Sequence, residues 1–274
     1  MLHGGADPRD LGLQQKRRRA IVDERHLHHF GEDAGLDRHS RFAKRLHESL
    51  VERPRRVPGK RFLEAAGLPT PAWSEAPHWR GIDQGRWIVK SVTEDASFGL
   101  DDAAVVSGKK AVVARAQECA ARHGGRWFAE RYVHGREFNV AVIEREGEPY
   151  LLPIGEMVFQ RWEAGKPRIV GYAAKWQEAT EEYRDTTRMY GWHERQPDLQ
   201  QSLEQVSREC WKLFGLTGYA RVDFRVDARG RPFILEVNTN PCLEPDAGVA
   251  ASCAQAGLPY DELIEDIVRA ALRG

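Results

Sequence analysis

Hydrophobic positions beyond residue 57 recur at the intervals of mixed helices and strands. One apolar stripe at helical spacing follows Pro197 and Asp198, a plausible helix start, and consists of Leu199, Leu203, Val206, Cys210 and Leu213. A second amphipathic stripe covers residues 260–271. In chain order we also expect helices over 60–66 and 107–123 and strands over 86–90, 127–132, 137–144, 150–154, 219–226 and 232–238. Because two strand pairs read as antiparallel hairpins, the pattern favours an α+β fold over an all-parallel sheet.

The segment before residue 58 lacks this pattern. Its first 56 residues hold 13 Lys and Arg against nine Asp and Glu, six of the ten histidines, and only two aromatic side chains, Phe30 and Phe42. So little apolar surface does not offset the entropy of ordering the chain. We therefore expect a charged, Arg- and His-rich arm over 1–57, poorly ordered, and one folded domain over 58–274. A nucleic-acid-binding arm is the alternative, against which the interleaved acidic residues argue.

Composition narrows the class of protein. The 274 residues carry 41 Lys and Arg and 41 Asp and Glu, so the formal net charge is zero. Proteins that bind nucleic acid or anionic membranes usually carry a basic excess, so neither partner is expected. No apolar run approaches the ~20 residues of a membrane helix, and no signal peptide is visible at the start. None of the four cysteines forms a C-x-x-C pair, so a reduced, cytoplasmic protein is expected.

The hairpin over 219–238 carries the most informative chemistry. A turn of two or four residues would give paired positions that sum to 457, so odd positions of the first strand would share a face with even positions of the second. One face then carries Arg221, Asp223, Arg225, Glu236 and Asn238, and the other carries Val222, Phe224, Val226, Phe233, Leu235 and Val237. Asp223, Glu236 and Asn238 offer the hard oxygen ligands that Mg²⁺ prefers. An ordinary half-buried hairpin shows the same alternation, although the tight polar run 238–241 favours the metal site.

Three further segments are compatible with a nucleotide site, and each alone is also typical of an ordinary surface. Lys90 ends a strand and precedes a small polar loop over 91–99, which contains Ser97 and whose N–H groups could cover phosphates. The segment 130–133, followed by Glu137, could contact adenine through its backbone and ribose through a carboxylate. Lys175 lies among the small residues of 171–176. No Walker-type phosphate loop occurs in the sequence.

The order of these segments resembles the ATP-grasp superfamily, and most closely its D-alanine–D-alanine ligase branch. The motifs that carry the resemblance are residues 63–71, Val89-Lys90, 130–137, Ala174-Lys175, 220–223 and 235–241. It covers about residues 58–273, and the Arg-x-Asp and Glu-x-Asn pair at its end is the most specific part. The resemblance implies two α+β subdomains that hold ATP between antiparallel sheets.

Carried over residue by residue, the resemblance also implies roles. ATP contacts are implied for Lys90 and Lys175 at the phosphates, for Glu130 and the backbone of Arg131 and Val133 at adenine, and for Glu137 at ribose, with Ser97 added from the phosphate-covering loop. The implied ligands of Mg²⁺ or Mn²⁺ are Asp223, Glu236 and Asn238. Arg221, near the reacting acyl group, and Lys175 are implied as catalytic. The implied partners are amino-acid or peptide substrates, and a homodimer is compatible with the resemblance.

The implied reaction is amide-bond ligation. ATP phosphorylates a substrate carboxylate, and an amine then displaces phosphate from the acyl phosphate, while metal and lysine charges offset the crowded anions. Two departures bear on this activity. Residues 1–56 match nothing in the amino-acid-binding N-terminal domain of such ligases, and Cys242 stands where they usually have glycine. The alternative is therefore a non-catalytic or truncated ATP- and Mg-binding module that has lost its amino-acid-binding domain.

Overall fold

The computed structural model describes residues 56–94 and 97–273. The chain divides into two units, Met1–Val51 and Glu52–Gly274, and the described residues all belong to the second. The arm expected over 1–57 therefore lies outside the described residues except for Arg56 and Val57, as do Asp95 and Ala96 of the expected phosphate loop. Among the described residues, no helix combines the length and apolar character that crossing a membrane requires.

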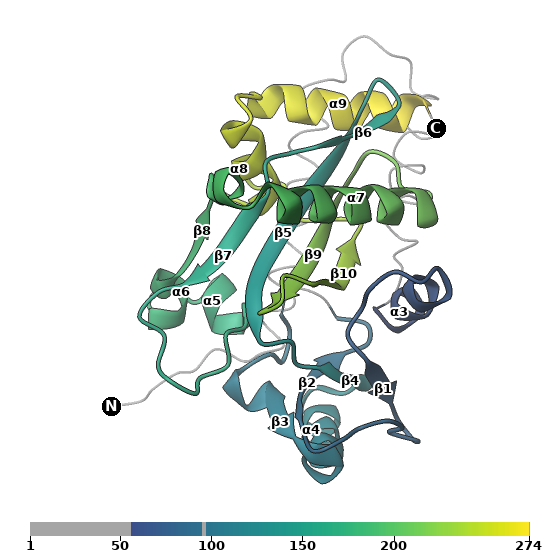
Figure 1. Cartoon of the computed structure of the whole chain (residues 1–274), viewed down its shortest axis with the longest axis vertical. Coiled ribbons are helices and arrows are strands. Elements are labelled where there is room, and N and C mark those ends of the chain that lie inside the picture. Colours follow the sequence, from purple (N-terminus) through teal and green to yellow (C-terminus); the bar gives the residue numbers. More distant parts are fainter. Residues whose placement is uncertain (1–55, 95–96, 274) are drawn as a thin grey trace. The chain divides into compact units, whose positions relative to one another are not determined.

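A smaller sheet of four antiparallel strands is built in the order β1-β4-β2-β3 (Figure 1). Its strands are β1 (Trp73–Glu75), β2 (Arg86–Ser91), β3 (Val105–Ser107) and β4 (Trp127–Arg131). Helix α4 (Gly108–His123) packs on this sheet through Val112, Ala116 and Cys119, which share one core cluster with Trp87 and Val89. The helix ends at Gly124, whose positive φ of 71° suits glycine.

A larger sheet has the order β10-β9-β5-β7-β8, with β6 paired to the far part of β5. Its strands are β5 (Gly135–Arg145), β6 (Glu148–Leu151), β7 (Gly155–Phe159), β8 (Thr186–Met189), β9 (Tyr219–Asp227) and β10 (Pro232–Asn238). Every pairing in it is antiparallel. The long β5 therefore lies at the centre and carries three of the pairings.

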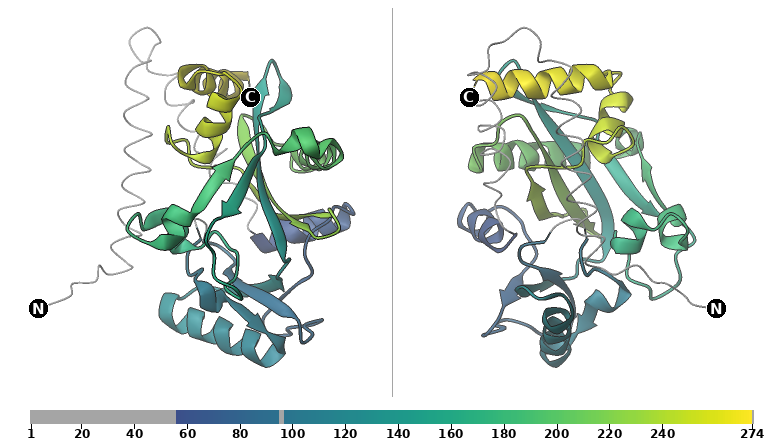
Figure 2. Two further views of the ribbon diagram at one scale, coloured as in Figure 1. Left: turned by 60° about the vertical axis from the view of Figure 1, so that its left-hand side comes forward. Right: turned by 180° about the vertical axis from the view of Figure 1, so that it is seen from behind.

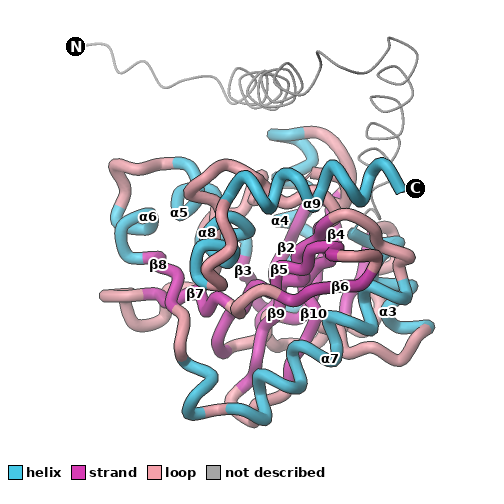
Figure 3. Tube along the Cα trace, turned by 90° about the horizontal axis from the view of Figure 1, so that it is seen from above, coloured by secondary structure: helices cyan, strands magenta, loops and turns pink. Residues whose placement is uncertain are grey.

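Helices cover both faces of the larger sheet. Figures 2 and 3 show α7 (Pro197–Leu213) on one side and α8 (Gly248–Gln255) and α9 (Tyr260–Arg273) on the other. Short helices and 3₁₀ turns connect the remaining elements: α3 (Arg56–Ala65), η2 (Asp102–Ala104), α5 (Tyr172–Trp176), α6 (Glu181–Asp185) and η3 (Trp192–Arg195). Helices α8 and α9 cover only part of their face of the sheet, and the remaining part of that face lines a cleft.

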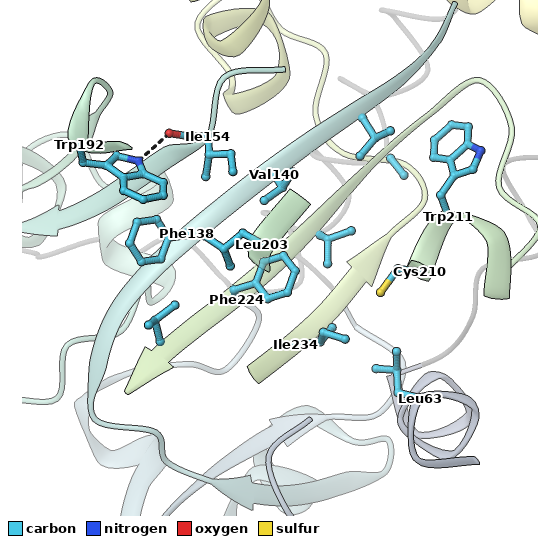
Figure 4. Packing of buried hydrophobic residues seen from close by; sticks show 14 residues of the cluster. Leu63, Phe138, Val140, Ile154, Trp192, Leu203, Cys210, Trp211, Phe224 and Ile234 are labelled. Atoms are coloured by element: carbon cyan, nitrogen blue, oxygen red, sulfur yellow. Dashed lines mark hydrogen bonds between the residues drawn. The ribbon is translucent and has the colours of Figure 1, made fainter. Parts of the chain in front are cut away.

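The largest core cluster lies between α7 and the sheet. Figure 4 shows Leu203 and Cys210 of α7 over Phe138 and Phe224 of β5 and β9, with Leu63 of α3 at one end. Fully burying a leucine such as Leu203, which is 0 % exposed, contributes about 1.5–3 kcal/mol. At the other end, the indole Nε1 of Trp192 donates to the Ile154 carbonyl at 2.9 Å, so the buried aromatic has its polar atom satisfied.

Most long elements agree with the sequence pattern to within a few residues. The expected helices over 107–123 and 260–271 and the stripe behind Pro197 correspond to α4, α9 and α7. The expected helix over 60–66 begins four residues earlier, at Arg56, so the boundary placed after residue 57 falls inside α3. Short elements such as β1, β3 and β8 were not predicted, because three or four residues are too few to show a period.

The hairpin of β9 and β10 corrects the expected pairing. Its turn has three residues, with Gly230 in the left-handed region, so Asp227 pairs with Arg231 and the sum is 458 instead of 457. A β-bulge at Leu235 then shifts the register, and Asp223 pairs with Glu236. Consequently Ile234, and not Phe233, enters the core, while Arg225 faces Phe233. The expected grouping of Arg221, Asp223, Glu236 and Asn238 on one face is confirmed.

Candidate active site

A cleft with about 620 Å³ of empty space lies between the smaller sheet and the larger sheet, and we refer to it as the central cleft. Of the site residues expected from the sequence, those that line it are Lys90, Ser97, Glu130, Arg131, Val133, Glu137, Lys175, Asp223 and Glu236. The remaining two are adjacent to it. Asn238 lines a neighbouring pocket together with Glu236, and Arg221 hydrogen-bonds to Asp223.

Strand register aligns polar side chains in rows on the cleft face of the larger sheet. Asn139 of β5 pairs with Asp223 of β9, which pairs with Glu236 of β10, and Arg221 pairs with Asn238 in the next row. Arg221 donates from Nε and Nη2 to the two oxygens of Asp223 at 2.7 and 2.8 Å, and Asn139 donates to Oδ1 at 2.8 Å. These three hydrogen bonds fix the Asp223 carboxylate in one orientation.

The candidate metal ligands offer two carboxylates and one amide oxygen. Within residues 56–94 and 97–273, no three His, Cys, Asp or Glu side chains gather into a metal-binding cluster. Glu236 forms an ion pair with Arg56 at 3.0 Å. Burial alone would raise the pKa of Glu236, but the charges of Arg56 and Lys175 lower it to about 2. An ionised carboxylate with spare lone pairs next to Asp223 fits Mg²⁺, which takes its other ligands from water and phosphate oxygens.

A buried cluster of two lysines and one glutamate lies where α3 meets both sheets. Glu130 of β4 is 1 % exposed and forms ion pairs with Lys60, at 2.7 Å, and with Lys90. Burial would raise the pKa of Glu130, but the two ammonium charges hold it below its usual value. Lys60 also donates to Thr70 Oγ1 at 2.7 Å and to the Ile234 carbonyl at 3.1 Å. The carboxylate expected at adenine is therefore held by two lysines, one of which the sequence pattern did not indicate.

One end of the central cleft is apolar. Ile88, Leu100, Tyr132, Ile169 and Leu235 line it beside the β4–β5 connection. A flat, weakly polar ring fits such walls, with backbone groups providing the few hydrogen bonds. The amide of Arg131 already donates to the Ala72 carbonyl at 2.7 Å, and the Arg131 side chain pairs with Asp83. The backbone amide of Arg131 is therefore already used within the protein. Of the two backbone positions expected at adenine, Val133 is the one whose amide none of these contacts uses.

Glu137 also lines the central cleft and is buried. Its Oε2 is 3.2 Å from Nη2 of Arg225, which also donates from Nη1 to the Gly135 carbonyl at 2.8 Å. Burial raises the pKa of Glu137, although the Arg225 charge opposes that shift. The carboxylate expected at ribose is therefore positioned by an arginine on the neighbouring strand.

Lys175 and Ser97 differ in how their polar atoms are used. Lys175, the fourth residue of α5, has no ion pair or hydrogen bond from its ammonium group among the described residues, and it lines the cleft. Burial and the nearby Arg221 charge lower the pKa of Lys175. Ser97 has a positive φ of 61° and donates its hydroxyl to the Val170 carbonyl at 2.6 Å. Lys175 is thus available to an anion, whereas the Ser97 hydroxyl ties its loop to residues 163–171.

Three side chains at the site were not among those expected from the sequence: Arg56, Lys60 and Asn139. Arg225 was expected on the face of Asp223, but without a role. Asn139 could have been found, because it lies two residues from Glu137 on the same strand. Arg56 and Lys60 gave no such signal. They lie one helical turn apart in α3, so they share a face. Arg56 was counted with the basic arm, and Lys60 with the helix expected over 60–66.

Comparisons with known proteins agree with this geometry. A family profile described as "D-ala D-ala ligase C-terminus" matches residues 86–269. The D-alanine–D-alanine ligase of Halorhodospira halophila is 31 % identical over 219 residues, which are 78 % of this chain and 65 % of that protein. The enzyme of the same name from Albidiferax ferrireducens is 26 % identical over 221 residues, covering 78 % of this chain and 59 % of that protein. The chain thus spans about six-tenths of the length of these relatives.

Solved structures share the fold. D-alanine–D-alanine ligase from Bacillus anthracis, crystallised with ATP, superimposes with a TM-score of 0.60 at 21 % identity, covering 80 % of this chain and 65 % of that one. The VanG D-Ala:D-Ser ligase of Enterococcus faecalis gives a TM-score of 0.60 at 17 % identity, covering 79 % and 61 %. The expected ATP-grasp fold, with α+β subdomains built on antiparallel sheets, is thereby confirmed.

Proposed function

Because this chain belongs to the D-alanine–D-alanine ligase family, we propose that it is an ATP-dependent ligase that joins a carboxylate to an amine through an acyl phosphate. The observation that carries the proposal is the row formed by Asp223 and Glu236, which faces the same cleft as the ammonium of Lys175, a group with no ion-pair partner in the part of the chain that the structure describes. Carboxylates and a cation on one cleft are what a metal-assisted transfer of phosphate needs.

In this proposal the central cleft holds ATP. The base occupies the apolar end beside Tyr132 and Leu235, ribose hydroxyls reach Glu137, and the phosphates extend toward Lys90 and Lys175. Lys90 forms an ion pair with Glu130, so its ammonium group is fixed in place before a nucleotide binds. Fixed charges stabilise a transferring phosphate without reorganising, which is why this arrangement favours transfer as well as binding.

Asp223, Glu236 and Asn238 would hold Mg²⁺ or Mn²⁺, and the bound ion would supply positive charge to the transferring phosphate. Arg221 is held by Asp223 through Nε and Nη2, which leaves Nη1 for the substrate. There it would bind the carboxylate to be phosphorylated and later stabilise the oxyanion of the tetrahedral intermediate. The amine substrate is an amino acid or a peptide, and a cytoplasmic location and a homodimer are further expectations of the same proposal.

Phosphate release is the measurement that tests this function. The full chain with Mg-ATP should release phosphate only when amino acids or dipeptides are added, and mass spectrometry should detect the amide product. Asp223→Asn combined with Glu236→Gln should abolish release, while Glu262→Gln, a half-exposed carboxylate on α9, should leave it unchanged. Binding of Mg-ATP with no release for any amino-acid pair would instead support the non-catalytic module.

A further inference from the structure

Arg188 of β8 faces the cleft side of the larger sheet, although neither the sequence motifs nor the proposed ATP site include it. It pairs with Met157 of β7, which pairs with Glu137 of β5, which pairs with Arg225 of β9. Side chains that are paired across neighbouring strands point to one face. Arg188 therefore belongs to the face that carries Asp223 and Glu137, with β7 and β5 between its strand and β9.

The Arg188 side chain occupies space that is open because Gly155 and Gly248 have no Cβ. A Cβ at Gly155 would lie 2.8 Å from Cδ of Arg188, which is closer than real contacts allow. A Cβ at Gly248, the first residue of α8, would lie 3.2 Å from Nη2 of Arg188 and 3.7 Å from Nη1 of Arg221. Two guanidinium groups from different strands therefore meet beside Gly248.

The charges of these two arginines are balanced differently. Asp223 neutralises Arg221 through two hydrogen bonds. Arg188 makes no ion pair and no side-chain hydrogen bond with any residue in the described part of the chain, and its Nε is buried without a partner. Two carboxylates on the same face of the sheet, Glu137 of β5 and Asp223 of β9, are already paired with other arginines. A partly buried cation beside a second cation is unfavourable unless an anion joins them.

We propose that Arg188 is a specificity-determining residue that binds a carboxylate of the amine substrate next to Gly248. The inference rests on the proposed ligase function, because it places the amine substrate on the Arg221 side of the cleft. A guanidinium donates two parallel hydrogen bonds to a carboxylate, and Nε and Nη2 of Arg188 form one such donor edge. The carboxylate is either the α-carboxylate of an amino acid or a second, side-chain carboxylate.

The test measures KM for the amine substrate by phosphate release with alanine, alaninamide and aspartate, each enantiomer in turn, as probes. Arg188→Met should raise KM for the preferred amino acid by about tenfold or more, the loss expected for a charge-assisted hydrogen bond, and leave KM for ATP unchanged. Arg188→Lys should restore part of the loss. Gly248→Ala should raise this KM less than Arg188→Met does, because a Cβ 3.2 Å from Nη2 would shift the guanidinium only slightly.

The probes separate the two sources of the carboxylate. A preference of the wild-type chain for aspartate over alanine that disappears in Arg188→Met assigns the side-chain carboxylate. Equal use of both amino acids with poor use of alaninamide, again lost in Arg188→Met, assigns the α-carboxylate. If wild-type and Arg188→Met chains share the same KM for all probes, the inference is wrong even though the ligase function stands. Absence of release by the wild-type chain would overturn the ligase function itself, and with it this role. Melting curves check that the variants are folded.

Discussion

Lys60 Nζ lies 2.7 Å from Oε2 of Glu130, and the two side chains are 2 % and 1 % exposed. This ion pair joins α3 to the smaller sheet, while the hydrogen bond from Lys60 to the Ile234 carbonyl joins α3 to the larger sheet. One ammonium group thus contacts both walls of the central cleft. Lys60 therefore acts as a positioning residue for Lys90, which shares the same carboxylate.

We expect Lys60→Met to destabilise the fold strongly. Removing one partner of a buried ion pair costs up to about 3–5 kcal/mol, and Lys90 would offset part of this loss by remaining next to Glu130. Arg61→Met is the matched control in the same helix, because Arg61 is exposed and its pair with Glu75 contributes at most about 1 kcal/mol. Urea unfolding of the two variants checks the difference, and equal midpoints would contradict the assigned role.

Acid stability should also depend on Lys60. The pKa of Glu130 is lower in the folded state than its usual 4.5, so its ion pairs stabilise the fold above pH 4.5 and lose this contribution as pH falls toward the folded pKa. Lys60→Met removes one of the charges that lower this pKa. The fall in stability should therefore begin at a higher pH in the variant. Thermal melts between pH 3 and about pH 7 measure the shift, and parallel curves for both chains would count against it.

Lys90 and Lys175, the two lysines proposed to contact the phosphates, should behave differently on substitution. Lys175 has no ion-pair partner among the described residues, so Lys175→Met should change the melting temperature little while lowering turnover by about 100-fold or more. Lys90→Met should lower both quantities, because Glu130 loses a buried partner. Melting curves and phosphate-release rates on each variant distinguish these outcomes.

Truncation before α3 should be tolerated, whereas truncation inside it should not. A chain that begins at residue 52 keeps Arg56, which pairs with Glu236, and Val57, which is buried. A chain that begins at residue 58 loses both, and we expect its melting temperature to be lower by roughly 4 °C or more. Mg-ATP should raise the melting temperature of the longer chain. If the two truncated chains melt at one temperature, the start of α3 contributes nothing.

Sequence reasoning grouped Asp223 with Glu236 although its expected register was wrong, because the bulge at Leu235 makes the sum of paired positions odd again. It placed Leu235 itself on the apolar face, whereas Leu235 lines the central cleft. Alternation alone puts Asp223 on one face and Val222 on the other. The pairing partner of each residue, by contrast, depends on turn length and on the bulge, and neither has a clear sequence signal in Asp227–Leu235. Long periodic helices such as α7 and α9 were predictable because many positions repeat the same pattern.

Partners from distant elements were not predictable in the same way. Lys60 and Glu130 are 70 positions apart, and no local pattern signals their contact. Arg188 lies on a four-residue strand, and its position depends on glycines at 155 and 248. Such contacts depend on how the elements pack in three dimensions, so they became visible only in the fold.

Leu235 is the extra residue of the β-bulge in β10. Ile234 pairs with Phe224 before it and Glu236 pairs with Asp223 after it, so Leu235 faces no partner on β9. Deleting it would restore an uninterrupted ladder and keep both neighbours on their present faces. Strand β10 could therefore lose or gain the Leu235 side chain, which lines the cleft, without moving Glu236 to the other face. Under the proposed function, the contact of Leu235 with the nucleotide and the contact of Glu236 with the metal would therefore be separable along β10.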